Sequence, residues 1–408
     1  MSRAQATPVA RRRVFYIPGY DPIHPRRYRE LYRKEGSEQA WISGYDLSLR
    51  ARDTKHGFGW QVSAQIEGAE VDTEFEVLVW SDIVRDSMAG SIAATYGHLL
   101  RTAWIYISTG TLWRLMRLRK GPVVAALYPV GALLLQALMA VVLGGLVWRA
   151  LTMMIPGAAV AWIAGICGVC AGLALLRWFK ARDGKAFVYY LMHDYAHAAR
   201  GYGAYPPELE DRLDRFRTRI AQSLSSEVDE VLVVGHSSGA HLAVSVLADL
   251  TRSGLPKPNG PELSFLSLGQ VVPMVSFLPD ATRLRADLAC LSTQQKMTWV
   301  DVTAPGDGCA FALCDPVAVT GVAPPEKRWP LVLSAAFTQT LSPERWRALR
   351  WRFFRLHFQY LCAFDMPGSY DYFRITAGPM TLAARFAGRA PSKSRIETPV
   401  SKYTSVAA

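Results

Sequence analysis

Two long apolar runs constrain this chain more than any other feature of its sequence. Residues 121–148 contain no charged side chain, residues 150–176 contain none either, and only Arg149 separates the two runs. About 20 apolar residues suffice to cross a hydrocarbon layer of roughly 30 Å as a helix. We therefore predict two transmembrane helices, at about 122–148 and 151–176, joined by a turn in the segment MMIPG. A buried helical hairpin of a soluble protein is the alternative.

Basic residues flank this pair of runs. The net charge of the 408-residue chain is +12, yet no Asp or Glu occurs between Ser87 and Arg182. The flanking cations are Arg101, Arg114, Arg117, Arg119 and Lys120 on one side and Arg177, Lys180 and Arg182 on the other. An excess of Lys and Arg marks the cytoplasmic ends of membrane helices. We expect an integral membrane protein whose soluble parts both lie on the cytoplasmic side of the inner or plasma membrane.

The remaining composition argues against several classes of protein. The chain has no zinc-finger spacing and no aromatic RNA-binding motif, so its positive charge does not indicate a nucleic-acid partner. The six cysteines form no disulfide framework, and Cys167 and Cys170 lie inside an apolar run, where they are typical packing residues. The cluster RRRVF resembles the start of an export signal, but Pro18 ends its apolar stretch too early. We expect a reduced, cytoplasmic soluble part without metal or cofactor.

Strand and helix patterns alternate around the apolar runs. Residues 13–17, 75–82 and 231–234 are short, mainly apolar segments typical of buried strands, and residues 209–224 carry apolar side chains at helical spacing. This alternation predicts an α/β fold with a mostly parallel sheet and helices on both faces. The domain would consist of residues 1–97 and 186–387, interrupted by a membrane insertion at 98–185. The polar tail, residues 388–408, is predicted to be disordered.

The segment GHSSG, residues 235–239, has the pattern G-x-S-x-G between a predicted strand and a predicted helix. In a nucleophile elbow, this sharp turn exposes a serine at the carboxyl edge of a sheet. Small residues on both sides let the strand and the helix approach each other closely. A phosphate-binding turn is the structural rival, but the Lys-Ser/Thr pair of such turns does not follow.

The segments VLVVGHSSGAHLA and VFYIPGYDP resemble those of the α/β-hydrolase superfamily, which contains serine lipases and esterases. The likeness covers about residues 13–85 and 186–360, with the apolar pair as an insertion. It implies that Ser237 is the nucleophile and that the backbone amide of Ser238 stabilises the oxyanion of the reaction. The second amide would come from the early loop, at Gly19 and Tyr20, where this chain lacks an HGGG motif.

The resemblance also implies the chain order serine, acid, histidine for a catalytic triad. Only two histidines follow Ser237: His241 lies in the helix that begins at the serine turn, and His357 lies far downstream. His357 is therefore the candidate base that takes the proton of the serine. Its alternative is an ordinary histidine in an aromatic segment.

Several aspartates could orient this base. Asp307 comes just after the predicted strand MTWVDVTAP and is the favoured acid, although an aspartate in a Pro-Gly-Asp-Gly turn is often only a turn former. Asp301 within the strand and Asp315 further along the loop stay open as alternatives, and Asp82 is a weaker one.

Two further features have a structural and a functional interpretation. His193 and His197 have the spacing of a metal pair but lack the H-E-x-x-H pattern, which favours packing. Residues 342–361 combine a Ser-Pro helix start with interleaved arginine and aromatic side chains. Such a helix either packs on the domain or lies on an anionic membrane surface.

Together these features predict a membrane-anchored serine hydrolase that cleaves an ester-type bond of a lipid or other acyl ester. A thioester substrate or acyl transfer to an alcohol would use the same residues. The expected partners are membrane lipids and a small ester or lipid substrate. The alternative is an inactive membrane scaffold or accessory protein built on the same fold.

Overall fold

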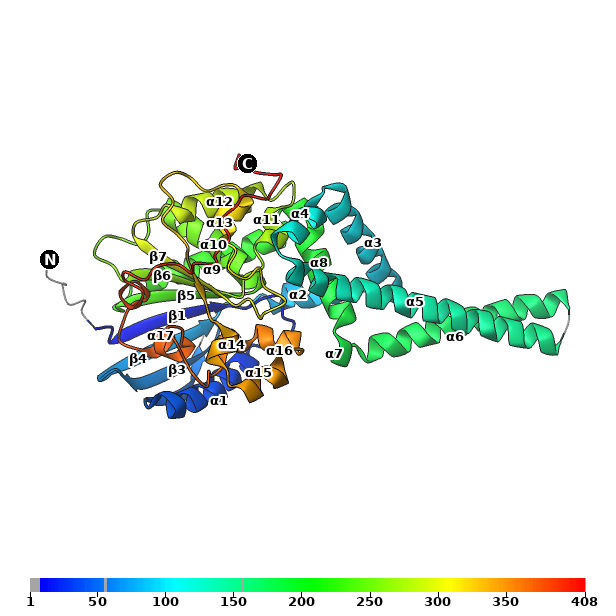
Figure 1. Cartoon of the computed structure of the whole chain (residues 1–408), viewed down its shortest axis with the longest axis horizontal. Coiled ribbons are helices and arrows are strands. Elements are labelled where there is room, and N and C mark those ends of the chain that lie inside the picture. Colours follow the sequence, from blue (N-terminus) through cyan, green and yellow to red (C-terminus); the bar gives the residue numbers. More distant parts are fainter. Residues whose placement is uncertain (1–7, 55–56, 156, 408) are drawn as a thin grey trace.

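An eight-stranded sheet forms the centre of the protein. The computed structural model describes residues 8–54, 57–155 and 157–407, and its strands lie in the order β2-β3-β4-β1-β5-β6-β7-β8 (Figure 1). The strands are β1 (Arg11–Ile17), β2 (Asp46–Thr54), β3 (Gly57–Ile66), β4 (Ala69–Val77), β5 (Glu230–His236), β6 (Glu262–Leu268), β7 (Met297–Thr303) and β8 (Leu331–Ser334). All pairs from β4 through β1 to β8 are parallel, whereas β2, β3 and β4 form an antiparallel meander. The predicted α/β fold with a mostly parallel sheet is confirmed.

Helices cover both faces of this sheet because its central strands are apolar on both sides. In β1, Val14 and Tyr16 pack into one hydrophobic cluster, while Phe15 and Ile17 pack into another. This division follows from the two-residue period of a strand. Over one face lie α9 (Pro207–Ser223), α10 (Ser238–Arg252), α11 (Pro273–Ser276), α12 (Thr282–Ser292) and α13 (Pro316–Thr320) (Figure 1). Over the other lie α1 (Arg26–Ser43), α14 (Phe337–Thr340), α15 (Pro343–Leu349), α16 (Phe353–His357), α17 (Tyr372–Ala377) and α18 (Leu382–Arg385).

The two apolar runs form a helical hairpin that extends away from the α/β domain (Figure 1). Its helices are α5 (Lys120–Met154) and α6 (Ala158–Ala181). They pack through small residues: a Cβ added at Gly144 would lie 2.8 Å from the carbonyl oxygen of Gly168. Large apolar side chains such as Leu134 are exposed on the outside of the hairpin. By length and composition, both helices could span a membrane.

Both hairpin helices differ from the predicted spans at the turn that joins them. α5 continues through Arg149 as far as Met154, and α6 begins only at Ala158. Arginine is a good helix former, so one arginine does not end a helix. The first helix is therefore longer than the predicted span 122–148, and the second starts later than residue 151.

Several helices connect the base of the hairpin to the domain. They are α2 (Ser81–Met88), α3 (Ile92–Ser108), α4 (Thr111–Leu118), α7 (Asp183–Ala186) and α8 (Val188–Ala199). Leu99, Leu133 and Met192, from α3, α5 and α8, share one hydrophobic cluster. The guanidinium of Arg119 donates two hydrogen bonds, of 2.9 and 2.7 Å, to the carbonyl oxygen of Ala312 in the loop after β7. The hairpin therefore starts beside the carboxyl edge of the sheet.

The C-terminal tail lies along the domain through residue 407, which corrects the predicted disorder of residues 388–408 except at Ala408, which lies outside the described residues. Ile396 forms a parallel bridge with Cys314, and the amide of Ser392 donates to the carbonyl oxygen of Val332 at 2.9 Å. The polar composition of the tail suggested disorder because a segment with few apolar side chains buries little surface. Here backbone hydrogen bonds make the attachment, and composition does not reveal them.

Residues 342–361 do not form one continuous helix. They are divided into α15, α16 and a short 3₁₀ helix (Gln359–Leu361). Arg345 forms ion pairs with Glu35, Glu38 and Asp365 of the domain, so its charge is not directed to a lipid surface. Trp351, between α15 and α16, is 72% exposed. Exposed tryptophans are common where a protein meets the membrane–water interface, so this residue still fits the expected contact with a membrane.

Candidate active site

Ser237 occupies a strained turn between β5 and α10. Its φ of 56° and ψ of −123° lie outside the regions that L-residues usually adopt. The turn is possible because the residues two positions before and after Ser237, Gly235 and Gly239, have no side chain. A Cβ added at Gly239 would lie 2.6 Å from the carbonyl oxygen of Pro18, and one at Gly235 would lie 2.8 Å from the Cα of Ala240. The strand, turn and helix expected around GHSSG are all present, with Ser237 at the carboxyl end of its strand.

A histidine and an aspartate meet at the same edge of the sheet. Asp307 follows β7, His357 ends α16, and Nδ1 of His357 lies 2.7 Å from Oδ2 of Asp307. Tyr360 donates its hydroxyl to the same oxygen at 3.0 Å. The amide of Cys309 donates to Oδ1 at 2.9 Å. These contacts hold the buried carboxyl of Asp307 and the ring of His357 in one relative orientation.

The charged form of Asp307 is favoured despite its burial. Burial raises the pKa of this carboxyl, but the nearby His357 and the hydrogen bonds from His357, Cys309 and Tyr360 outweigh it and lower the pKa below its usual value. An ionised carboxylate can only accept hydrogen bonds, so Nδ1 of His357 carries a proton. The other ring nitrogen, Nε2, is then free to accept one.

Ser237 and His357 line the same cavity, which has a volume of about 90 Å³. The amide of Ser237 donates to the carbonyl oxygen of Leu268 at 2.9 Å, and a Cβ added at the next residue, Gly269, would lie 3.1 Å from Cε1 of His357. Among the described residues, no hydrogen bond joins the hydroxyl of Ser237 to the ring of His357. Catalytic hydrogen bonds are often long until substrate binds. Ligand pockets usually measure roughly 300–1,000 Å³, so a larger substrate would require the walls to move.

The base of the hairpin supplies much of the wall of this cavity. Tyr190 and Asp194 come from α8, Phe354 comes from α16, and Pro122 comes from the first turn of α5. Figure 1 shows these helices at the junction between the domain and the hairpin. A membrane that contained the hairpin would therefore lie close to the cavity.

Gly19, Tyr20 and Ser238, the expected oxyanion residues, also line this cavity. A Cβ added at Gly19 would lie 2.9 Å from the Cβ and 3.4 Å from the Oγ of Ser237, so only glycine fits there. Ser238 is the first residue of α10, and an amide in the first turn has no acceptor within its helix. Backbone amides in such positions can stabilise negative charge on a group attached to Ser237.

The other candidate acids have different partners. Asp301 is buried within β7, accepts a hydrogen bond from Ser267 at 2.6 Å, and has its pKa raised to about 8 by burial. Asp315 caps α13 and forms an ion pair with Lys327. Asp82 forms an ion pair with an arginine of α9. Of the four aspartates considered from the sequence, the structure brings Asp307 to His357.

The remaining histidines considered from the sequence lie in packed surroundings. His241, within α10, lies 2.9 Å from the hydroxyl of Tyr205, and burial lowers its pKa to about 3. His193 packs against His98. His197 packs against Tyr20 and Trp80. In the part of the chain that the structure describes, His193 and His197 belong to no group with the geometry of a metal site.

One group among the described residues has ligand atoms close enough for a metal ion. Asp307, Cys309 and His357 each offer an atom, and these atoms lie within 4.8 Å of one another. Burial raises the pKa of the Cys309 thiol well above its usual value, so the thiol stays protonated. A protonated thiol is a poor ligand, and the Asp307–His357 hydrogen bond already uses the other two side chains.

Asp194, which lies in the wall of the cavity near His357, was not predicted from the sequence. It is one helical turn from Tyr190 and from Ala198, which line the same cavity. This spacing places the three residues on one face of a helix and is the signal in the sequence that indicates Asp194.

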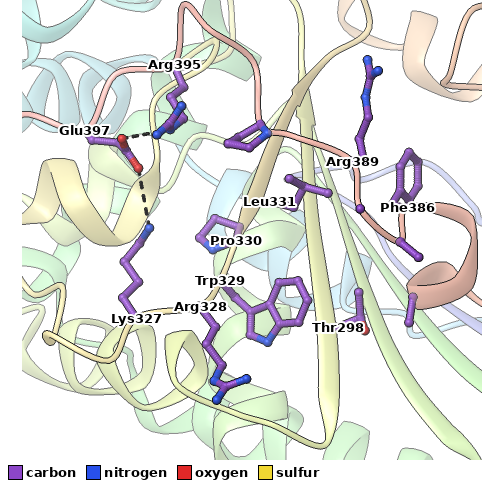
Figure 2. Close-up of a pocket in the computed structure, with 14 residues that line it drawn as sticks. Thr298, Lys327, Arg328, Trp329, Pro330, Leu331, Phe386, Arg389, Arg395 and Glu397 are labelled. Carbon is purple, nitrogen blue, oxygen red and sulfur yellow. Dashed lines mark ion pairs between the residues drawn. The ribbon is translucent and has the colours of Figure 1, made fainter. Parts of the chain in front are cut away.

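A second hollow, of about 390 Å³, lies around the start of β8 and the tail. Four cations line it, but Figure 2 shows the side chains of Arg328 and Arg389 pointing away from each other. Lys327 and Arg395 form ion pairs with Glu397. The cations therefore do not converge on one point, as an anion site would require.

Comparison of the chain with protein-family models, curated proteins and solved structures found no match.

Proposed function

We propose that this protein is a membrane-anchored serine hydrolase that cleaves an ester-type bond of a lipid or other acyl ester. The observation that carries the proposal is the combination of a strained Ser237 and an Asp307-bound His357 around one cavity. A strained serine after a buried strand has little structural purpose on its own, because such backbone conformations cost about 1–3 kcal/mol. The resemblance of GHSSG and its surroundings to the α/β-hydrolase superfamily supports the same conclusion.

In the proposed reaction, the hydroxyl oxygen of Ser237 attacks the carbonyl carbon of the ester. Nε2 of His357 takes the hydroxyl proton, and the carboxylate of Asp307 stabilises the resulting imidazolium through Nδ1. The amide of Ser238, with that of Gly19 or Tyr20, would donate hydrogen bonds to the oxyanion. His357 then protonates the leaving alcohol, which leaves an acyl group on Ser237.

Hydrolysis completes the cycle. A water molecule gives a proton to His357 and attacks the acyl carbon, and the acid is released when the proton returns to Ser237. If an alcohol attacks in place of water, the same residues transfer the acyl group. A lipid substrate is favoured because two apolar residues line the cavity: Pro122, at the base of the apolar hairpin, and Phe354 of α16.

The inactive scaffold is the second candidate. Two observations favour it: the cavity measures only about 90 Å³, and among the described residues the hydroxyl of Ser237 makes no hydrogen bond to His357. A scaffold would keep the hydrolase-like turn without reacting at it.

A fluorophosphonate probe separates these two candidates. We expect covalent labelling of the detergent-solubilised full chain, no labelling of Ser237→Ala, and unchanged labelling of the control Ser253→Ala, whose serine is exposed at the end of α10. Absence of labelling in a folded wild-type protein would support the scaffold instead.

A further inference from the structure

Asp194 is a carboxyl in the cavity wall that has no hydrogen-bond or ion-pair partner among the described residues. It lines the cavity together with Ser237 and His357, and no hydrogen bond or ion pair connects it to another described residue. The other aspartate of this wall, Asp21, contacts Arg27 and Tyr28. A polar group in a mostly buried wall normally finds a partner, so the partner of Asp194 comes from outside the chain.

The nearby hydroxyl groups are used elsewhere. Tyr20 bonds to Ser87, Tyr106 donates to the carbonyl oxygen of Met274, and Tyr190 donates to that of Tyr20. The thiol of Cys309 and the hydroxyl of Tyr195 are close enough to Asp194 to interact with it electrostatically, and burial keeps both neutral by raising their pKa. Among the described residues, the surroundings thus offer Asp194 neutral groups and no cation except His357 in its charged form.

These surroundings determine which ligands Asp194 can accept. Burial raises its pKa to about 7, an effect that the nearby His357 reduces. In its neutral and its ionised form the carboxyl has an oxygen that accepts a hydrogen bond. A donor is therefore favoured at any pH near neutrality, a cationic donor is favoured further as pH rises, and an anion is disfavoured.

The position of Asp194 near His357 indicates which part of a substrate it would meet. In the proposed reaction His357 protonates the leaving alcohol, so the alcohol part lies on the side of His357, whereas the carbonyl oxygen lies toward the amides at Gly19 and Ser238. The imidazolium that His357 becomes during this reaction would act directly on Asp194, since His357 lowers the pKa of that carboxyl.

We propose that Asp194 determines substrate specificity by accepting a hydrogen bond from the alcohol part of the ester, and that this alcohol carries a hydroxyl or protonated amine close to the ester bond. The inference rests on the proposed function. It narrows the substrate class to esters of polyols or amino alcohols and disfavours esters whose alcohol part is anionic.

The test compares three butyrate esters that differ only in the alcohol: propyl butyrate, glyceryl monobutyrate and 2-(dimethylamino)ethyl butyrate. We expect kcat/KM of the full chain in detergent to be about tenfold higher for each donor-carrying ester than for propyl butyrate, which corresponds to about 1.4 kcal/mol. Asp194→Leu should remove both preferences, so that kcat/KM becomes similar for the three esters. The control Asp214→Leu, on the exposed side of α9, should keep both preferences.

A second variant separates the two kinds of donor. Asp194→Asn keeps an oxygen acceptor but no charge, so it should keep most of the preference for the glyceryl ester and lose that for the amino ester. Raising the pH from 6 to 8 should increase the preference of the wild type for the amino ester alone.

Equal hydrolysis of all three esters by the wild type, or unchanged preferences in Asp194→Leu, would overturn the inference while leaving the proposed function intact. Fluorophosphonate labelling of each variant shows whether its site is still formed. If the wild type neither hydrolyses an ester nor reacts with the probe, the proposed function fails and the inference fails with it.

Discussion

Three hydrogen bonds converge on the carboxyl of Asp307. They explain why this acid stays ionised although it is buried. His357, Tyr360 and the amide of Cys309 replace the water that burial removes. Asp301, a few residues earlier, receives one hydrogen bond from the described part of the chain, donated by Ser267, and burial raises its pKa to about 8. Two aspartates of the same segment therefore differ in charge because of their partners.

Replacing Asp307 by asparagine tests its role in orienting His357. The amide group would donate to Nδ1, which moves the ring proton to Nε2 and leaves no acceptor for the serine proton. We expect kcat/KM for a short ester to fall by about 10³–10⁴-fold in Asp307→Asn. Tyr360→Phe removes one hydrogen bond and should reduce kcat/KM by about tenfold at most. A loss of less than tenfold in Asp307→Asn would contradict this role.

Asp301→Asn tests the neutral state of the buried acid. Its folded pKa is about 8, above the unfolded value near 3.9, so the folded state binds more protons between these pH values. Stability from this group is therefore lost as pH rises through that window, by about 1.4 kcal/mol per pH unit. Asparagine does not titrate, so the variant does not lose stability in this way. Its melting temperature relative to wild type should rise steadily from pH 5 to pH 7.5, whereas a constant difference would show that Asp301 is ionised when folded.

The sequence predicted those residues of the site that depend on their neighbours in the chain better than those that depend on tertiary packing. Ser237 was predictable because its turn depends on adjacent residues, with Gly235 and Gly239 beside it. Asp307 could not be separated fully from Asp301 and Asp315, because the path of the loop after β7 decides which one reaches His357. Asp194 was missed because its role depends on how α8 packs against the domain.

The turn from β5 into α10 depends on a close contact between the backbone of α10 and the end of β1. Gly239 brings α10 against the end of β1, and a Cβ there would collide with the carbonyl oxygen of Pro18 at 2.6 Å.

Among helices, periodicity predicted α9, since Leu209, Leu213 and Phe216 form its buried face. The helix expected over residues 342–361 from its Ser-Pro start is not continuous, because Arg352 has φ of −102° and ψ of 68° and interrupts it.

Gly239→Ala and Gly97→Ala provide a matched pair. Gly97 lies in α3 with open space around its Cα, so alanine should stabilise the protein slightly, by about 0.5–1 kcal/mol. Gly239→Ala should destabilise it by roughly 2–4 kcal/mol, because backbone atoms cannot yield to the added methyl group. Thermal unfolding in detergent compares the two. Equal stability of Gly239→Ala and wild type would show that α10 does not approach β1 as described.

At the scale of the whole molecule, the hairpin and the cavity meet. The start of α5 supplies Pro122 to the cavity wall, while Arg119 fixes that start to the loop after β7. Two uncharged runs predicted the hairpin, but nothing in the sequence predicted where its base would contact the domain. The contact explains how an insertion far from Ser237 in sequence comes to lie beside it.

Membrane extraction tests the role of the hairpin. We expect the full chain to stay with membranes after washing with alkaline carbonate, since each helix exceeds the roughly 20 residues needed to span a bilayer. A version with residues 126–174 replaced by a short Gly-Ser linker should be released. Release of the full chain by carbonate would instead indicate a hairpin that only lies against the membrane or packs on another protein.

The rate at which a fluorophosphonate modifies Ser237 depends on the proposed nucleophile and on its base, His357. We expect a single adduct on the peptide containing Ser237, formed at least about a hundredfold more slowly in His357→Gln, because no base then takes the proton. Mass spectrometry of the digested protein locates the adduct, and a time course gives the rate. An adduct on another residue, or equal rates in the two proteins, would show that Ser237 and His357 do not act together as nucleophile and base.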